Sequence, residues 1–494
     1  MIELERLCDQ SLPLICHIID TQYVGHTVYV IEVKHGYGSI QQVWTVRHRY
    51  SDFVKLRDQL ALSGLALELP PKQMIGNTSN EFVAARRLGL QKFLDQVMDH
   101  TMLSVSAPFL EFMVPSDLQL CFSQYLSSGT QAVSIALRNL RGWEVKKMWR
   151  NAGWRVNKSY YLVNSLQVRH RTDILSWTKQ RVDDNANDLK VALSFLCQLS
   201  HPYLLSPQFA WCSNDGVLLI YSHLPDGMLR DQFCKAKPSD PYLKKFCNPE
   251  MVYPLGVDDI RHVGRHILEA LLFVRKLGIP YANLHASNIG VLNSGCVLTD
   301  IESGVLSLHS YYWPLLVQLK TIQTLEQIDV YCFGHTLFEL CTGDALMQAC
   351  IPEGAPLSCD ARLKLLLYSI LSDRAIQDGM PTIDDLINND LFSPVRASRP
   401  HQSQITIPAS AQRQFRAAGE RLLADLRTHQ IEYRRSVQAM KVNAWLRSDE
   451  WRSRRRRTVR QGSLSTMGAT FACNNNNSHD GTDEAPTSST NETA

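Results

Sequence analysis

Residues 46–53 read VRHRYSDF, and this stretch decides the fold of the first part of the chain. Basic side chains and a tyrosine stand where an alternating apolar pattern changes to a helical one, which continues over residues 53–60. Three alternating segments typical of strands come before it, at residues 14–19, 27–34 and 40–46. The pattern predicts a three-stranded meander that packs against helices.

Cationic side chains recur after this stretch at positions that suit one phosphate pocket. The stiff turn LPPK ends in Lys72, and a helical pattern over residues 82–97 carries Arg86 and Arg87. Guanidinium groups bind phosphate oxygens in a bidentate manner, and lysine adds a point charge. Together with Arg49, these cations suit a phosphoinositide headgroup better than a carboxylate metabolite. A solvated basic face would give the same pattern.

Three motifs, in this order and at these separations, resemble the PX domain, a phosphoinositide-binding fold of endosomal proteins. They are RYSDF (residues 49–53), PPK (residues 70–72) and RRLGLQKFL (residues 86–94). The resemblance implies roles for Arg49 on the 3-phosphate, Tyr50 beneath the inositol ring, Lys72 near the 1-phosphate and Arg86 on the 4- and 5-hydroxyls. It implies phosphatidylinositol 3-phosphate as the first candidate ligand.

Two apolar residues, Met74 and Ile75, follow Lys72 closely. Beside a headgroup pocket they would form a membrane-insertion loop, which adds apolar burial to charge attraction. The alternative is a loop that packs on its own domain.

The composition of the whole chain limits its class. Its 494 residues predict two to four domains, and 45% hydrophobic with 20% charged residues can bury a core. Lys and Arg number 51 and Asp and Glu 48, and the net charge of +3 argues against nucleic-acid binding by bulk charge. We expect no signal peptide or membrane span. We expect the 13 scattered cysteines to be reduced thiols of a cytoplasmic protein, without a metal site.

A second globular stretch covers about residues 123–396, with strand-like segments first and helical periodicity later. Four landmarks in it resemble the protein kinase fold over residues 140–395. They are HPYL at 201–204, YANLHASN at 281–288, TDIE at 299–302 and DVYCFG at 329–334. We expect a small strand-rich lobe and a larger helical lobe, and the resemblance implies a structural anchor at Asp329.

The residues that would transfer a phosphoryl group are largely replaced. Asn288 matches the kinase asparagine that binds a second magnesium ion, and five residues earlier Asn283 stands where the family has its catalytic aspartate. An amide lacks the basicity to accept the substrate proton. Asp300 matches the metal-binding aspartate, but Glu302 replaces the glycine of that triplet.

The amino-terminal part of the kinase-like stretch departs further. Gly153 is the one glycine among residues 150–163, so no glycine-rich loop covers phosphates. Ala192 stands nine residues before His201, where kinases carry the helix glutamate, and no Val-Ala-x-Lys pattern precedes it. Lys179 is the alternative source of a strand lysine. The stretch is therefore predicted to be a pseudokinase that requires no cofactor, with weak binding of Mg-ATP left open.

The sequence predicts an α+β multidomain chain of four parts: a PX domain at 1–120, a degenerate kinase-like domain at 121–400, one long exposed helix at 401–450, and an Arg-rich segment with a disordered tail at 451–494. The Arg-rich segment suits acidic lipid, a nuclear import signal or a simple flank of the helix. Phosphorylation at Thr458 or Ser463 would weaken its attraction to lipid.

The order of the two domains, with the segments at 235–249 and 284–288, resembles a family of PX-containing kinase-like proteins. The resemblance implies endosomal trafficking of surface receptors and binding to sodium-pump beta subunits. Vertebrate members also end in a Pro-rich region and an actin-binding WH2 motif. Neither is recognised in this sequence, so actin binding is not expected.

The function predicted is that of a phosphoinositide-binding peripheral membrane adaptor, cytoplasmic and on endosomal or plasma membranes, whose inactive kinase-like domain binds proteins. Two alternatives stay open. One is an atypical, weakly active or nucleotide-sensing kinase, and the other is a cytosolic scaffold indifferent to lipid.

Overall fold

The structure is a computed structural model of the chain. It describes residue 9 and residues 11–72, 79–149, 158–179, 186–248, 252–292, 295–352, 354–398 and 405–447. The chain up to Arg434 forms one compact unit, and the contacts described below lie within it.

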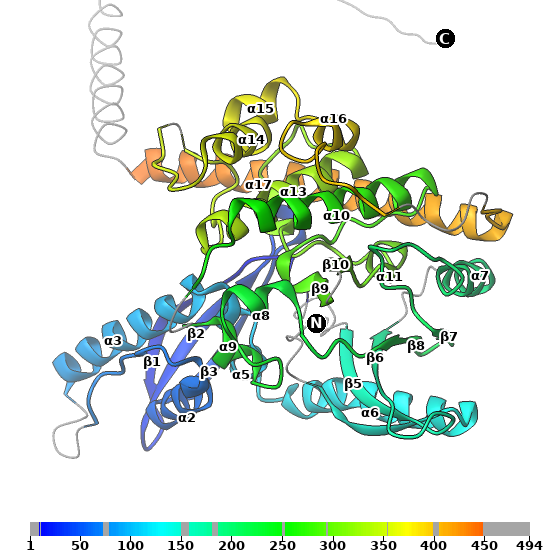
Figure 1. Cartoon of the computed structure of the whole chain (residues 1–494). Helices are drawn as coiled ribbons and strands as arrows, with labels where there is room; N and C mark the ends of the chain where they lie inside the picture. The colour runs from blue at the N-terminus through cyan, green and yellow to red at the C-terminus, as the bar shows by residue number, and fades with distance from the viewer. Residues whose placement is uncertain are drawn as a thin grey trace, which may run out of the picture. The chain divides into compact units, whose positions relative to one another are not determined.

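The first sheet has three antiparallel strands in the order β1-β2-β3 (Figure 1). Their bounds are β1 Leu14–Tyr23, β2 Thr27–His35 and β3 Gln42–Arg49. Tyr29, Ile31 and Val33 are buried because alternate residues of a strand face the same side. The predicted meander is confirmed. Strands β1 and β3 continue further than predicted, and Ile40 lies in a short 3-10 helix before β3.

Helices pack around the core of this sheet. They are α2 Tyr50–Leu60, α3 Asn80–Asp99, α4 Thr101–Ser104 and α5 Ala107–Phe112. Helix α2 begins at Tyr50 because the Asp52 carboxylate accepts a hydrogen bond from the backbone N–H of Arg49 at 3.0 Å. This cap fixes Arg49 and Tyr50 at the junction of β3 and α2.

Helix α6 (Gln119–Leu140) belongs to two hydrophobic cores. Its first turn places Phe122 in the core of the first domain, and its later turns pack Val133 and Leu137 on the second sheet. The predicted boundary after residue 120 falls near the start of this helix.

The second sheet has five antiparallel strands in the order β4-β5-β6-β8-β7. Their bounds are β4 Trp143–Met148, β5 Lys158–Ser165, β6 Thr172–Lys179, β7 Phe209–Cys212 and β8 Gly216–Ser222. On helix α7 (Ala186–Leu196), Leu189 and Leu193 join Val217 and Leu219 in one core. The predicted strand-rich lobe is confirmed.

The rest of the second domain is mostly helical, as predicted. Its elements are α8 Leu229–Phe233, α9 Tyr242–Phe246, α10 Val257–Lys276, β9 Ile289–Leu292, β10 Gly295–Leu298, α11 Glu302–Val305, α12 Trp313–Leu316, α13 Leu325–Thr342, α14 Ala361–Leu371, α15 Asp373–Asp378 and α16 Ile383–Asn388. Helix α13 is buried on nearly every face, which agrees with its apolar sequence. Across the described ranges, none of the helices is long and apolar enough to cross a membrane.

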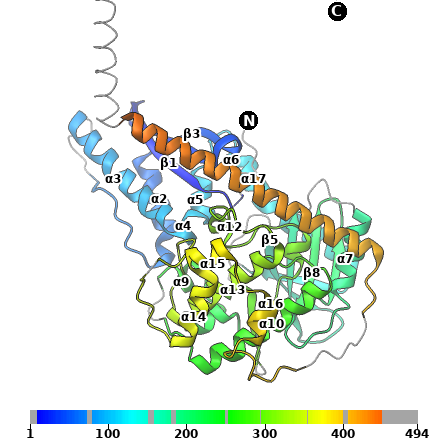
Figure 2. The ribbon, with the colours of Figure 1, turned by 90° about the horizontal axis from the view of Figure 1, so that it is seen from above.

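Helix α17 (Ala409–Arg447) is not exposed along its whole length, so that expectation is wrong. A stripe at helical spacing is buried: Phe415, Ala418, Leu422 and Leu426. Near the start of the helix, Arg413 forms an ion pair of 2.7 Å with Asp188 on α7. Figure 2 shows α17 passing close to α7, and the Phe415 ring lies 6.1 Å from that of Phe195. The helix is therefore part of the core of the second domain.

Candidate functional site

Two of the predicted headgroup residues, Tyr50 and Arg86, come together where α2 and α3 meet. The Arg86 side chain is buried, and its guanidinium carbon lies 4.6 Å from the centre of the Tyr50 ring and 4.1 Å from that of the Phe82 ring. A guanidinium nitrogen of Arg86 donates a hydrogen bond to the carbonyl oxygen of Pro71 at 3.2 Å. The Tyr50 hydroxyl donates to the carbonyl oxygen of Pro70 at 2.6 Å. These bonds tie the proline turn to Tyr50 and Arg86.

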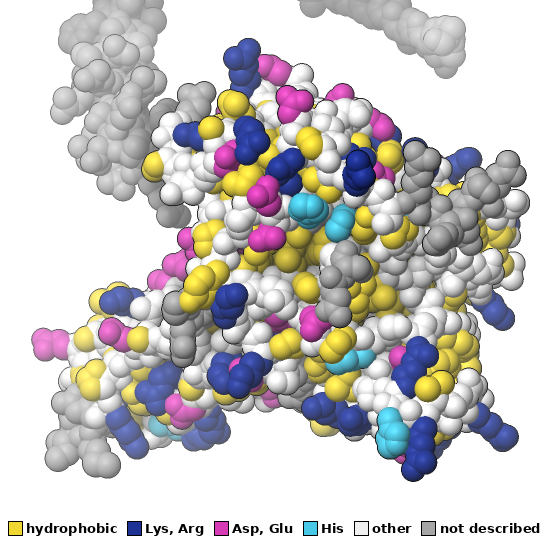
Figure 3. Space-filling view, in the orientation of Figure 1, with side chains coloured by type: hydrophobic (Ala, Val, Ile, Leu, Met, Phe, Trp, Pro, Cys, Tyr) yellow, Lys and Arg dark blue, Asp and Glu magenta, His cyan; other side chains and the backbone are white. Residues whose placement is uncertain are grey.

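Arg49 lies next to this group and faces solvent. Its side chain is 56% exposed, and its Nε lies 3.7 Å from Oδ1 of Asp52. With Arg47 and His26 it lines a hollow of about 340 Å³. Lys72, at the end of the proline turn, is exposed as well. Figure 3 shows further Lys and Arg side chains on the surface of this domain. The structure therefore offers an accessible guanidinium fork for a phosphate.

Two other expectations for this domain have different outcomes. The Arg87 guanidinium donates hydrogen bonds to the carbonyl oxygens of Ile18 at 2.6 Å and Ile19 at 3.1 Å. Arg87 therefore ties α3 to β1, and the expectation that it joins the phosphate site is wrong. Met74 and Ile75 lie outside the described residues.

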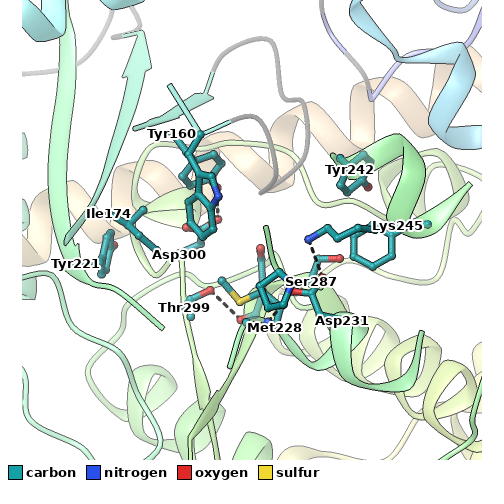
Figure 4. Close-up of a pocket in the computed structure, with 15 residues that line it drawn as sticks. Tyr160, Ile174, Tyr221, Met228, Asp231, Tyr242, Lys245, Ser287, Thr299 and Asp300 are labelled. Atoms are coloured by element: carbon teal, nitrogen blue, oxygen red, sulfur yellow. Dashed lines mark hydrogen bonds and ion pairs between the residues drawn. The ribbon is translucent and has the colours of Figure 1, made fainter. Parts of the chain in front are cut away.

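The second domain contains a buried cluster of charged side chains between strand β5 and the start of α11, which we call the cleft cluster. The Nζ of Lys158, on β5, lies 2.6 Å from Oε1 of Glu302 and 3.0 Å from Oδ1 of Asp300. The Tyr160 hydroxyl donates a hydrogen bond to Oδ2 of Asp300 at 2.7 Å (Figure 4). All four side chains are buried. Both carboxylate oxygens of Asp300 therefore already have partners in the protein.

Hydroxyl groups complete the surroundings of Glu302. The Ser176 hydroxyl donates to Oε1 at 3.2 Å, and the Tyr221 hydroxyl donates a short hydrogen bond to Oε2. Burial and the nearby Glu302 carboxylate raise the pKa of Tyr221 well above its ordinary value, so this hydroxyl keeps its proton. A buried carboxylate with an ammonium and two hydroxyl donors is well satisfied.

A small cavity of about 50 Å³ adjoins the cluster (Figure 4). Its lining is mostly aromatic and apolar and includes Trp149, Tyr160, Ile174, Tyr221, Met228, Tyr242 and Phe246. On one side the Nζ of Lys245 pairs with Oδ1 of Asp231 at 2.6 Å. Among the described residues, the volume of this cavity lies below that of pockets for drug-sized ligands, about 300 Å³ or more.

Two of the predicted degenerate kinase positions, Asn288 and Asp300, line this cavity. The side-chain amide of Asn288 donates to the carbonyl oxygen of Asn283 at 2.9 Å, and both residues are buried. Position 192, on α7, is a buried alanine. Alanine has no carboxylate, so this position cannot pair with a lysine. Asp329 accepts a hydrogen bond from the backbone N–H of Ala282 at 2.9 Å, and burial raises the pKa of Asp329 to about 7. Asp329 therefore holds the backbone beside Asn283.

Comparison with known proteins agrees with both domain descriptions. A model of the PX domain matches residues 36–116. The PX domain-containing protein kinase-like protein of Mus musculus is 36% identical over 420 residues, which cover 84% of this chain and 71% of the mouse protein. The chain belongs to this family. The probable inactive serine/threonine-protein kinase slob1 of Dictyostelium discoideum is 32% identical over 219 residues, 40% of this chain and 36% of that protein. The Slowpoke-binding protein of Drosophila melanogaster is 29% identical over 208 residues, 39% of each chain.

Membership in the PX domain-containing protein kinase-like family agrees with the predicted pseudokinase, since one relative is named as an inactive kinase. Sequence reasoning missed the pairing of Lys158 with Glu302 in this family member. The alternative lysine, Lys179, is exposed at the end of β6, and its Nζ lies 4.8 Å from the centre of the Tyr125 ring. The sequence signal that could have revealed the pair of Lys158 and Glu302 is Lys158 itself, the first residue of strand β5.

Proposed function

We propose that this protein is a phosphoinositide-binding peripheral membrane adaptor in the endosomal trafficking of membrane proteins. One observation carries the proposal: Tyr50 and Arg86 meet the proline turn at one corner of the PX domain, and Arg49, the residue before Tyr50, faces solvent. The first candidate lipid is phosphatidylinositol 3-phosphate, on the cytoplasmic face of endosomal or plasma membranes.

The contacts at this corner support headgroup binding. The Tyr50 ring is held at its hydroxyl end and against Arg86, so it needs little ordering when a sugar ring stacks on it. The Arg86 guanidinium, held by the carbonyl oxygen of Pro71 and against the Tyr50 ring, is the donor that we assign to ligand hydroxyls. Arg49 and Lys72 supply exposed cations for phosphate groups.

The kinase-like domain serves this function as a protein-binding module that needs no cofactor. Asn283 offers an amide where phosphoryl transfer needs a base, and Asp300 is already bound by Lys158 and Tyr160. The Drosophila relative is named for binding Slowpoke, which supports a protein partner. Among candidate partners we favour membrane proteins, with sodium-pump beta subunits as the first to test.

Co-sedimentation with liposomes tests the proposal. The full chain and its Arg49→Ala variant are mixed with vesicles that carry each phosphoinositide in turn, at physiological salt, because low salt exaggerates surface electrostatics. A bidentate bond to a charged group contributes about 1.5–3 kcal/mol, so the variant should bind its preferred lipid roughly tenfold or more weakly. Arg57→Ala is the matched control, since Arg57 lies on helix α2, which begins directly after Arg49, and its guanidinium pairs with Asp58 at 2.8 Å.

The two outcomes separate the proposal from its alternatives. Selective binding to one phosphoinositide, lost in Arg49→Ala and kept in Arg57→Ala, supports the adaptor. Binding that follows only total negative charge, or that is equal in the two variants, favours a scaffold indifferent to the headgroup.

A further inference from the structure

The turn between β5 and β6 displays two apolar side chains at the end of the second sheet. Leu166 is 60% exposed and Val168 is 48% exposed. The turn is held by hydrogen bonds: the N–H of Val168 donates to the Ser165 hydroxyl at 3.1 Å, and that of Leu166 donates to the carbonyl oxygen of Gly142 at 2.9 Å. These apolar groups therefore project from an ordered turn.

Basic residues lie near this apolar pair, in the same turn and at the end of α6. Arg169 and His170 are exposed in the same turn, and Arg138 and Arg141 are exposed at the end of α6, which the bond to Gly142 joins to the turn. Residues 138–148 and 165–171 together contain six Lys and Arg residues and a single acidic one, Glu144. Figure 3 shows Lys and Arg side chains along the lower edge of the view, where Figure 1 places this sheet.

Arg171 is the basic residue that has a structural role here. Its Nε lies 2.9 Å from Oδ1 of Asp173, and it also donates a hydrogen bond to Gln208 on the neighbouring chain segment. Arg171 therefore fixes the base of the turn. The remaining cations belong neither to the headgroup corner, which is formed by Arg49, Tyr50, Arg86 and the proline turn, nor to the buried cluster of Lys158, Asp300 and Glu302.

We propose that this turn, with the end of α6, is a second membrane contact that binds anionic lipid without reading a headgroup. Two exposed aliphatic side chains with neighbouring cations match the interface of an anionic bilayer, where the apolar groups enter the acyl boundary and the cations meet lipid phosphates and carboxylates. An acidic protein surface would use the cations but would give exposed Leu166 and Val168 no apolar layer to enter.

This contact extends the proposed function without depending on the headgroup corner. A weak second contact on the same bilayer raises the overall avidity, because the second binding event becomes intramolecular. The PX corner would choose the membrane, and the turn would lengthen the time spent on it.

The test uses vesicles of phosphatidylcholine with phosphatidylserine and no phosphoinositide. The full chain is compared with the double variant Leu166→Asp/Val168→Asp. We expect the variant to partition roughly tenfold or more weakly, because it loses both apolar anchors and adds two like charges. The matched control is Met347→Asp/Leu365→Asp, which places two aspartates at positions 55% and 73% exposed elsewhere on the same domain.

The readouts distinguish this proposal from the previous one. Selective binding to phosphoinositide vesicles should survive in the turn variant and fail in Arg49→Ala, which also shows that the turn variant is folded. The proposal is overturned if the wild type ignores phosphatidylserine, if the turn variant binds as the wild type does, or if the control loses as much.

Discussion

Replacing Lys158 by methionine is the sharpest test of the buried cluster in the cleft. Methionine keeps much of the side-chain volume and removes the ammonium group. Glu302 and Asp300, whose oxygens lie 2.6 and 3.0 Å from that group, would be left as two buried carboxylates without their cation. The variant should lower the free energy of unfolding of the kinase-like domain.

The size of the effect follows from burial. The Lys158 side chain is 1% exposed and that of Glu302 is 0% exposed, so solvent screens the pair very little. Removing one partner of a buried ion pair costs about 3–5 kcal/mol. For a domain of this size each 1 kcal/mol shifts the melting temperature by about 2–4 °C, which predicts a fall of roughly 6 °C or more for Lys158→Met.

Thermal and urea unfolding of the full chain, followed by tryptophan fluorescence, measure this loss. The matched control is Lys179→Met, an exposed lysine on the neighbouring strand β6, which should cost less than about 1 kcal/mol. The double variant Lys158→Met/Glu302→Gln should recover part of the loss, because it removes an unpaired charge. A loss for Lys158→Met no larger than that of the control would refute the reasoning.

Two further predictions concern nucleotide and pH. Millimolar Mg-ATP should leave the melting temperature unchanged, because Lys158 and Tyr160 bind both oxygens of Asp300; a magnesium-dependent rise of several degrees would favour the nucleotide-sensing alternative. Burial lowers the pKa of His201 and of His266 in the folded protein from 6.5 to about 4. Each neutral imidazole therefore favours the folded state. This contribution to the free energy of unfolding is complete above pH 6.5 and should be lost as the pH falls toward 4. In His266→Phe, which keeps a ring against Tyr203, that fall in melting temperature should be smaller, and an unchanged pH dependence would contradict the assignment.

The fold was predictable where side-chain periodicity reports burial. The alternation in residues 27–34 became strand β2, and the apolar stripe around Ile260 and Leu268 became helix α10. The same rule explains the error on α17. Its charged composition suggested an exposed helix, but four apolar positions at helical spacing, from Phe415 to Leu426, were enough to bury one face.

The contacts of Tyr50 and Arg86 with the proline turn could be predicted from motifs, because each motif has its own local geometry. Arg49 and Tyr50 follow from a strand end and a helix cap, and Pro70 stiffens the turn that Tyr50 reaches. Arg86 and Arg87 show the limit of such reasoning. They are adjacent in sequence and chemically alike, yet successive positions of a helix face directions about 100° apart, so one meets Tyr50 and the other meets Ile18.

The cleft cluster was beyond sequence reasoning because its partners come from separate elements. Lys158 and Glu302 are 144 residues apart, and only the tertiary fold brings β5 to the start of α11. A motif search expects the lysine in a Val-Ala-x-Lys pattern and the glutamate on α7, where Ala192 stands. The search finds neither, although Lys158 and Glu302 form a buried ion pair from other positions.

Glu302 connects the departure from the kinase sequence pattern with the stability of the domain. At the position where kinases keep a glycine, a side chain restricts the backbone freedom that a mobile segment needs. The same carboxylate neutralises Lys158 and accepts hydrogen bonds from Ser176 and Tyr221, so it fixes the segment to the second sheet. Beyond it, Ser307 donates a hydrogen bond to the carbonyl oxygen of Ala418 on α17 at 3.3 Å. A segment held on both sides suits a constant binding surface better than a switch, and this favours the adaptor over a nucleotide-driven kinase.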